Sequence, residues 1–172
     1  MKHEFGKINQ QEWKETLDFM DFLGEKTNKA KIILIKGNHD TILGPLAERR
    51  GMEIKDYYIK SGFGFLHGNK QFPEVLDKEI KTLFVGHFHP AITLSEGVKK
   101  EKYKCFLEGK WGSKQIVILP SFFPFVEGAD VEIDKTNLDF KFNLKKFKVF
   151  IPVKGREVLE FGTVKKGGKL NL

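Results

Sequence analysis

The stretch Thr82-Leu83-Phe84-Val85-Gly86-His87-Phe88-His89-Pro90 decides the fold predicted for this chain. Its first four residues form a short apolar run, which is typical of a strand buried on both faces. The run ends in a glycine and two histidines. In α/β proteins the carboxyl ends of the strands form the ligand crevice, so the stretch predicts both a central strand and a site at its end.

Two further apolar runs resemble the first one. Ile32 to Ile35 is β-branched, reads as a strand buried on both faces, and leads into Lys36-Gly37, whereas Ile116 to Leu119 ends in Pro120-Ser121. Apolar residues recur at helical spacing from Asn9 to Asn28, which predicts an amphipathic helix. A helix followed by a buried strand indicates α/β layering.

Shorter patterns complete the predicted order of elements. They are a helix at Pro45–Arg50, strands at Glu53–Lys60 and Gly62–Leu66, a helix at Pro73–Ile80, strands at Ala91–Leu94 and Tyr103–Leu107 around a polar turn at Ser95–Lys102, and strands with one solvated face from Gly128 onwards, as in Leu138–Phe142 and Val158–Phe161; Lys165–Lys169 is expected to be a frayed or turn-forming end.

Length and composition predict one compact domain over residues 1–172. Hydrophobic residues make up 40% and charged residues 31%, which excludes a disordered chain and a membrane protein. No apolar run approaches the roughly 18 residues that a spanning helix needs. The first residues lack the apolar core of a signal peptide.

A single cysteine, Cys105, excludes an intramolecular disulfide framework and an all-thiolate zinc site. We expect this cysteine to be a small buried hydrophobe and the protein to be cytoplasmic. Thirty Lys and Arg against 23 Asp and Glu leave a net charge of +7, which favours anionic partners without choosing between nucleic acid, nucleotide and phosphorylated metabolite.

Four of the five histidines follow an apolar run and lie within three residues of a glycine: His39, His67, His87 and His89. Three separate strands are therefore predicted to deliver imidazoles to one edge of a sheet. In extended chain, residues two apart face the same side, and Pro90 favours extended backbone at His89. We thus expect His87 and His89 to serve one site while Phe88 packs inward.

The chemistry of this set indicates a transition metal. Imidazole nitrogens suit Zn, Fe, Mn, Ni or Cu, and Asn38 adds a neutral amide oxygen. Each feature alone has a structural interpretation: His67 alone is more often a hydrogen-bonded structural residue, and Gly37-Asn38-His39-Asp40 alone is a turn. Their joint occurrence after three strands favours a shared site.

The aromatic residues are assigned mainly to core packing. This assignment covers Trp13, Trp111 and most of the 17 phenylalanines. The cluster Phe122-Phe123-Pro124-Phe125 follows a strand end, so the alternative that it lines a pocket wall stays open.

Three ordered motifs resemble the calcineurin-like metallophosphoesterases, and more narrowly the ICC-like predicted phosphoesterases: Gly37-Asn38-His39-Asp40, His67-Gly68 and Gly86-His87-Phe88-His89. The resemblance covers roughly Lys31 to Pro124. It implies a β-sandwich flanked by helices that holds two divalent metal ions, with Mn favoured and Ni, Fe or Zn as alternatives. It also implies hydrolysis of a phosphodiester, such as a cyclic nucleotide or a nucleic-acid end, or of a phosphomonoester.

The same resemblance assigns roles to individual residues. Asn38, His67 and His87 would ligate one metal, and His89 would ligate the other. His39 would contact the phosphate and protonate the leaving oxygen, while Asp40 would orient the His39 ring.

The chain departs from the family pattern at its beginning. The family's Asp-x-His motif and its Gly-Asp motif, whose carboxylate bridges the metals, do not occur before Lys31, and the chain contains no Gly-Asp dipeptide. Asp18 and Asp21 lie on the predicted helix and are not assigned as ligands. Lys2-His3 resembles the pair that follows the bridging aspartate, so we expect a domain that is incomplete at its N-terminus.

This departure lowers the expected activity. Three neutral ligands bind a dication weakly, and absent strands would leave a sheet edge through which copies of the chain self-associate. Two other function classes stay open: an inactive module that binds nucleic acid or a partner through its positive charge, and a mononuclear metal-binding protein without hydrolytic activity.

Overall fold

The computed structural model describes residues 10–27, 31–40, 42–96, 98–131, 140–153 and 157–164. Contacts divide the chain into two compact units, residues 1–58 and 59–172. One domain over residues 1–172 stays a prediction. The elements in chain order are α1 (Gln10–Lys26), β1 (Ile33–Ile35), α2 (Leu43–Arg49), β2 (Glu53–Lys55), β3 (Tyr57–Lys60), β4 (Phe63–Leu66), α3 (Pro73–Leu76), β5 (Thr82–Val85), β6 (Pro90–Glu96), β7 (Lys99–Lys104), β8 (Phe106–Trp111), β9 (Lys114–Ile118), β10 (Ala129–Asp130), a 3₁₀ turn η1 (Leu144–Lys146), β11 (Lys148–Pro152) and β12 (Val158–Thr163).

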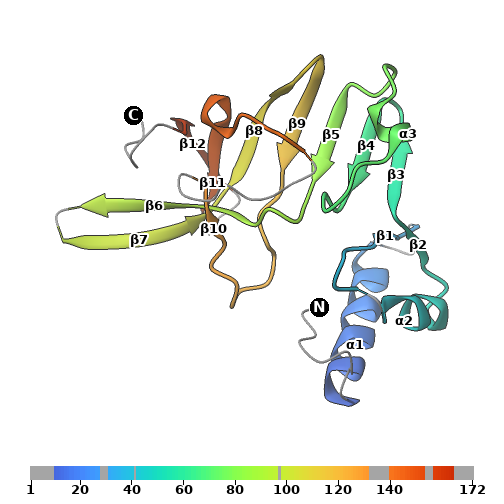
Figure 1. Ribbon diagram of the computed structural model, residues 1–172. Helices are drawn as coiled ribbons and strands as arrows, with labels where there is room; N and C mark the ends of the chain where they lie inside the picture. The colour runs from blue at the N-terminus through green and yellow to red at the C-terminus, as the bar shows by residue number, and fades with distance from the viewer. Residues whose placement is uncertain are drawn as a thin grey trace. The chain divides into compact units, whose positions relative to one another are not determined.

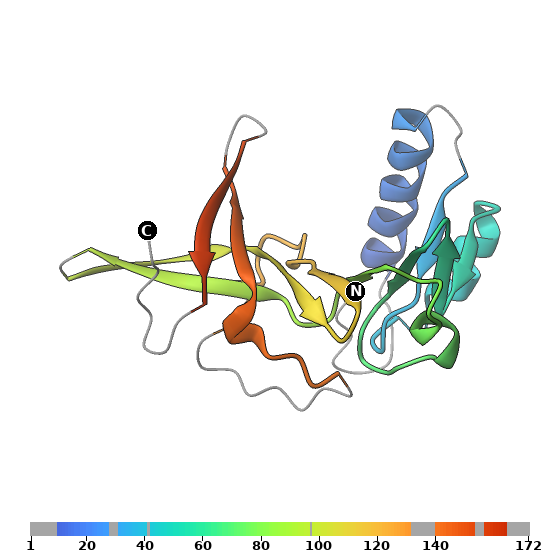
Figure 2. The same ribbon diagram turned by 90° about the horizontal axis from the view of Figure 1, so that it is seen from above.

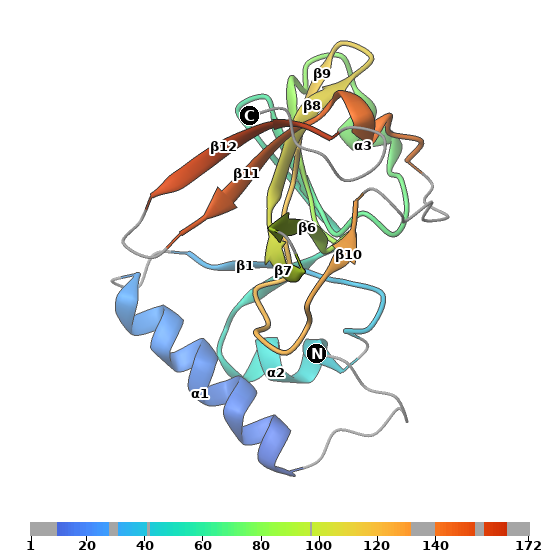
Figure 3. The same ribbon diagram turned by 90° about the vertical axis from the view of Figure 1, so that its left-hand side faces the viewer.

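The first unit contains two helices that lie side by side (Figure 3). Helix α1 confirms the predicted amphipathic helix, although Asn9 and Asn28 lie outside the described residues. Its Asp21 accepts two hydrogen bonds from the Arg50 guanidinium at the end of α2, at 2.5 and 2.8 Å. Asp18 accepts from Lys14 at 2.7 Å. Both carboxylates of α1 that sequence analysis left out of the site are thus paired with cations.

The strands of this unit differ from the prediction in two ways. β1 is half-buried rather than buried on both faces, because its ladder in the described structure is with β2 alone. The predicted strand Glu53–Lys60 is interrupted at Asp56. Its first part, β2, runs parallel to β1, and its second part, β3, joins a different sheet.

The second unit is built on a mixed seven-stranded sheet in the order β12-β11-β8-β9-β5-β4-β3 (Figure 1). β4, β5 and β9 are parallel neighbours at its centre, and β8, β11 and β12 continue it in antiparallel fashion. Fully buried side chains of these strands form the core, including Leu83, Leu107, Ile116, Ile118 and Val149. Together with the helices, these sheets confirm the α/β class.

Helix α3 is shorter than the predicted helix Pro73–Ile80. The backbone of Asp77 leaves the helical region, with ψ at 145°, and its carboxylate accepts a hydrogen bond from the Glu79 N–H at 2.8 Å. The buried Lys114 ammonium then donates to the carbonyl oxygens of Asp77 and Ile80. These tertiary bonds replace the last helical turn.

The polar turn predicted at Ser95–Lys102 is largely strand. β6 and β7 pair antiparallel from Ala91↔Lys104 to Glu96↔Lys99 and form a hairpin that projects from the second unit (Figure 2). The predicted strand Tyr103–Leu107 is divided between β7 and β8 at Cys105. β10 adds to the outer side of β6 in parallel orientation.

The C-terminal part confirms the strand at Val158–Phe161, which lies within β12. The strand predicted at Leu138–Phe142 is wrong for Phe140–Phe142, and its first residues lie outside the described part. Phe140 and Phe142 instead pack their rings against Trp111 at 5.5 and 5.7 Å. The end predicted at Lys165–Lys169 also lies outside the described part.

Cys105 is fully buried, as predicted. Burial raises the pKa of its thiol to about 12. The helices that the structure describes all lack the length and apolar character needed to cross a bilayer.

Candidate metal centre

Two neighbouring parallel strands of the second unit carry the centre of the candidate site. β4 and β5 pair in register from Phe63↔Thr82 to Leu66↔Val85. The Gly86 N–H continues this ladder by donating to the Leu66 carbonyl at 3.3 Å. The residues that follow the two strands therefore emerge at the same sheet edge, as the sequence predicted.

His67 and His87 meet at this edge. His87 Nδ1 lies 3.1 Å from His67 Nε2, and the ring centroids are 5.0 Å apart with the planes at 69°. One imidazole N–H donates to the ring nitrogen of the other. Both side chains are half-buried. Two ring nitrogens, both of a type that can bind a metal, thus lie within hydrogen-bond distance of each other at a partly buried position.

Glycines next to both histidines permit this approach. Gly68 has a φ of +108°, and a Cβ atom there would lie 2.5 Å from Val85 Cγ1. A Cβ atom on Gly86 would lie 3.2 Å from the His67 carbonyl oxygen. Side chains at these positions would push the two strand ends apart.

The backbone at His87 and His89 is not extended, which corrects the prediction. His87 has a φ of +66° and His89 a φ of +45°, so both are left-handed. The Phe88 N–H donates to the Gly86 carbonyl at 2.7 Å and closes a tight turn. Phe88 is buried and stacks on Phe142 at 5.5 Å, which confirms its inward packing. The alternation that would have placed both imidazoles on one side therefore does not apply.

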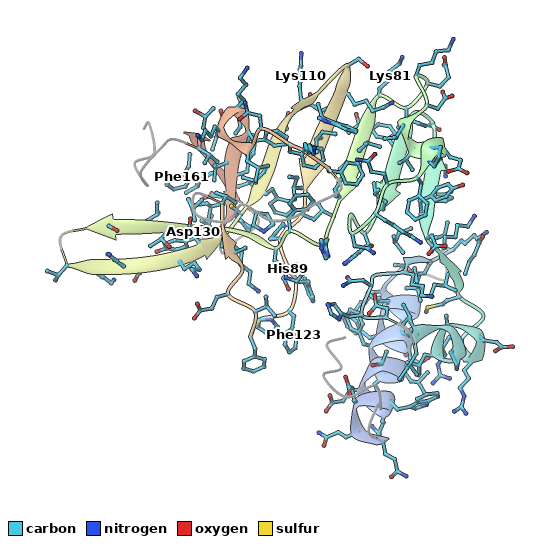
Figure 4. All side chains as sticks on the ribbon, in the orientation of Figure 1. Lys81, His89, Lys110, Phe123, Asp130 and Phe161 are labelled. Atoms are coloured by element: carbon cyan, nitrogen blue, oxygen red, sulfur yellow. The ribbon has the colours of Figure 1, made fainter. Side chains whose placement is uncertain are left out.

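The backbone of His89 is held by a distant segment. The Ala129 N–H donates to the His89 carbonyl at 2.8 Å, and a Cβ atom on Gly128 would lie 2.6 Å from the same oxygen. Figure 4 shows Phe123 on the loop that runs below His89 before the chain reaches Asp130 in β10. Sequence analysis missed this contact, because nothing local to Gly128 indicates a partner about forty residues away.

The Gly37–Asp40 turn follows β1 in the first unit. Asp40 Oδ2 accepts a hydrogen bond from the Gly37 N–H at 2.9 Å, and the Asp40 N–H donates to the Gly37 carbonyl at 3.2 Å. Asp40 therefore stabilises the turn that carries Asn38 and His39, whose side chains are exposed.

The structure brings two of the predicted residues together. His67 and His87 follow neighbouring strands of the seven-stranded sheet, whereas Asn38, His39 and Asp40 follow a strand of the two-stranded sheet in the other unit. Within the described ranges, no three His, Cys, Asp or Glu side chains form a group that could hold a metal ion. The metal-binding roles of Asn38, His67, His87 and His89 stay predictions.

The phenylalanine cluster after β9 is not part of the core. Phe122, Phe123 and Phe125 are 90%, 56% and 85% exposed. Phe19 and Phe22 on α1 are also about half exposed, so core packing is wrong for these phenylalanines as well. Aromatic content alone did not distinguish them from buried residues such as Phe140 and Phe147.

The fold and the histidine pair define an α/β protein with a polar sheet edge, and one solved structure shares this fold. It is the crystal structure of Pseudomonas putida nuclease MPE, with a TM-score of 0.51 and 16% sequence identity over 87% of this chain and 80% of the other. No family model matches the sequence, and no protein of curated function matches it.

Proposed function

We propose that the protein is a metal-dependent phosphoesterase that hydrolyses phosphodiester or phosphomonoester bonds with two divalent metal ions. The observation that carries the proposal is the 3.1 Å approach of His67 and His87 at the ends of two parallel strands. The fold shared with a nuclease supports the same class of reaction. We also propose that the chain has the β-sandwich fold of the calcineurin-like family, whose motifs its three sequence motifs resemble.

The histidine pair fits a metal. Ligand nitrogens about 2.0–2.1 Å from a metal are separated by about 3.3 Å in tetrahedral and about 2.9 Å in octahedral geometry. The observed separation of 3.1 Å lies between these values. Imidazoles suit Mn, Ni, Fe and Zn, of which we favour Mn.

We assign Asn38, His67 and His87 to one metal and His89 to the other. When bound, the metals would polarise the phosphate oxygens and supply hydroxide near neutral pH. His39 would contact the phosphate and donate a proton to the leaving oxygen. Asp40 holds the turn beneath His39 by accepting from Gly37, so in this proposal it positions the acid.

The ligand set carries little negative charge. Imidazoles and an amide are neutral, and no third His, Cys, Asp or Glu joins the pair among the residues that the structure describes. Metal affinity and turnover should therefore be weak. This observation favours a second candidate, a module that binds nucleic acid or a partner without hydrolysis.

Calorimetric titration of Mn and Zn into the metal-stripped protein tests the proposal, together with hydrolysis of a chromogenic phosphodiester. His87→Ala should abolish both metal binding and turnover, because it removes one of the two converging nitrogens. Lys110→Ala, which removes an exposed side chain of β8 that the proposal does not use, is the control and should change neither. Turnover that persists in His87→Ala, or metal binding that is equal in the two variants, would exclude this site.

A further inference from the structure

Three phenylalanines stand out from the loop that connects β9 to β10. We call residues 122–125 the phenylalanine loop. Phe122 and Phe125 are 90% and 85% exposed, and the rings of Phe123 and Phe125 meet edge to face at 5.5 Å. Leaving large apolar rings in water is unfavourable, so a cluster of them marks a binding surface more often than chance placement.

Hydrogen bonds hold the backbone of the loop in place. Lys104 Nζ donates to the carbonyl oxygens of Ser121 and Phe123, and Ser121 Oγ accepts from the Phe123 N–H at 3.2 Å. On either side of the loop, the Leu119 N–H donates to the Val85 carbonyl and the Ala129 N–H donates to the His89 carbonyl, each at 2.8 Å. The phenylalanine rings therefore extend from a backbone that hydrogen bonds hold in one conformation.

The same anchors connect the loop to the candidate metal centre. Val85 is the last residue of β5, directly before the turn with His87, and His89 is the end of that turn. The connection from Leu119 to Ala129, which contains the loop, is therefore hydrogen-bonded on both sides to the segment that carries His87 and His89. A ligand on the phenylalanine loop would lie beside this segment.

Strand β7, whose Lys104 binds the loop, carries further lysines. Lys100, Lys102 and Lys104 alternate along β7 and so share one face of the hairpin. Lys104 supports the loop, and Lys102 and Lys100 are exposed farther along β7, toward the hairpin turn. In the part of the chain that the structure describes, two acids lie on this side: Glu127 is 3.7 Å from Lys102, and Asp130 accepts from Thr93 at 2.8 Å. Among the described residues named here, three lysines face two carboxylates, which leaves a positive balance.

Exposed aromatic rings next to a short row of cations match an unpaired nucleic-acid strand. Bases stack on aromatic side chains without sequence preference, and lysines neutralise the phosphates. In a duplex the base faces are already stacked on one another, so the rings would find no partner there. A folded protein partner would require a continuous apolar surface, whereas this loop offers separate rings next to charges.

We propose that the phenylalanine loop is a stacking surface for unpaired nucleotides, which places a single strand beside the histidine turn. The proposal rests on the proposed function in one respect: single-stranded nucleic acid is the substrate only if the protein is a phosphoesterase. Binding itself depends only on the loop and on β7.

Fluorescence anisotropy with labelled oligo-dT and oligo-U of about 16 nucleotides tests the proposal, with EDTA present to prevent hydrolysis. The full chain should bind at least one oligomer more tightly than a duplex of equal length. Phe122→Ala/Phe125→Ala should weaken binding about tenfold or more, because it removes two rings on which bases would stack. Both side chains are largely exposed, so the variant should keep its fold.

The matched control is Phe19→Ala/Phe22→Ala, which removes two half-exposed rings from α1 and should leave binding unchanged. The proposal is overturned if neither oligomer binds, if the loop variant binds like wild type, or if duplex binds equally well. Hydrolysis of a small phosphodiester by wild type separates the two proposals. Oligomer binding without turnover leaves the stacking surface intact and rejects the phosphoesterase, and turnover without oligomer binding does the reverse.

Discussion

At the scale of single residues, the turn after β5 stores backbone strain. His87 and His89 have φ values of +66° and +45°, and neither is glycine. Residues in this region cost on the order of 1–3 kcal/mol each and persist only where the surroundings determine them. Here the burial of Phe88 and the hydrogen bond from the Ala129 N–H to the His89 carbonyl hold the backbone in this conformation. Such strain is most often found at functional sites.

Replacement of Gly68 should disturb the packing beside this turn. Gly68→Ala places a Cβ atom 2.5 Å from Val85 Cγ1 at a φ of +108°, whereas Gly112→Ala, at a φ of +60°, meets nothing within 4 Å. Urea denaturation should show a loss of about 1–2 kcal/mol for Gly112→Ala from backbone strain alone. Gly68→Ala should lose about 1–3 kcal/mol more, from overpacking. Equal losses in the two variants would contradict the close packing of the strand ends.

At the scale of elements, the β6–β7 hairpin forms despite its composition. β7 consists mostly of lysine and glutamate, which are depleted in strands, yet it pairs with β6 over six residue pairs. Lys99 forms an ion pair with Glu101 at 2.7 Å along one face. The opposite face, with Lys100 and Lys102, is the one available to phosphates.

The salt dependence of oligonucleotide binding should report these lysines. If Lys100 and Lys102 each neutralise one phosphate, the slope of log K against log salt contains about −1.4 from the pair. Lys100→Ala/Lys102→Ala should therefore make the slope less negative by about that amount. Lys145→Ala/Lys146→Ala removes the same charge from exposed positions in η1 and is the control. An equal change of slope in both variants would indicate a general charge effect.

The sequence predicted elements well where short apolar runs are buried. β5 coincides with the apolar run Thr82–Val85, and β9 overlaps the run Ile116–Leu119 but begins at Lys114 and ends at Ile118. Burial of a continuous apolar run between neighbouring strands explains this agreement. Elements fixed by distant contacts were not predictable. The end of α3 depends on Lys114, and the strand character of β7 depends on pairing with β6.

The same distinction holds for the candidate site. The meeting of His67 and His87 follows from two parallel strands, a relation that sequence order and apolar runs indicate. The left-handed turn at His87 and His89 follows from the packing of Phe88 on Phe142 and from the close approach of Gly128, and these two partners are distant in sequence. Local preference before proline favoured extended backbone at His89, and tertiary packing overrode it.

At the scale of the molecule, the seven-stranded sheet ends at β12. In the described structure this strand pairs with β11 alone, and it exposes Val158 and Leu159. An exposed apolar edge strand is a template for pairing with another chain. Self-association stays a prediction, and β12 is an edge other than the N-terminal one through which the sequence analysis expected it.

Sedimentation equilibrium should therefore detect reversible association that depends on Leu159. Leu159→Lys places a charge on the edge and should shift the equilibrium toward monomer, because pairing would bury that charge. Val98→Lys adds the same charge at the fully exposed hairpin turn and should leave association unchanged. Equal association in the two variants would place the contact elsewhere.

The buried thiol of Cys105 has a practical consequence. Its pKa of about 12 leaves almost no thiolate at neutral pH, and the thiolate is the form that reacts with maleimides. A dye can therefore be attached selectively to an introduced cysteine, such as Val98→Cys on the hairpin, while the native cysteine stays in place. The chain can be made into a fluorescent reporter of strand binding without first removing a residue from its core.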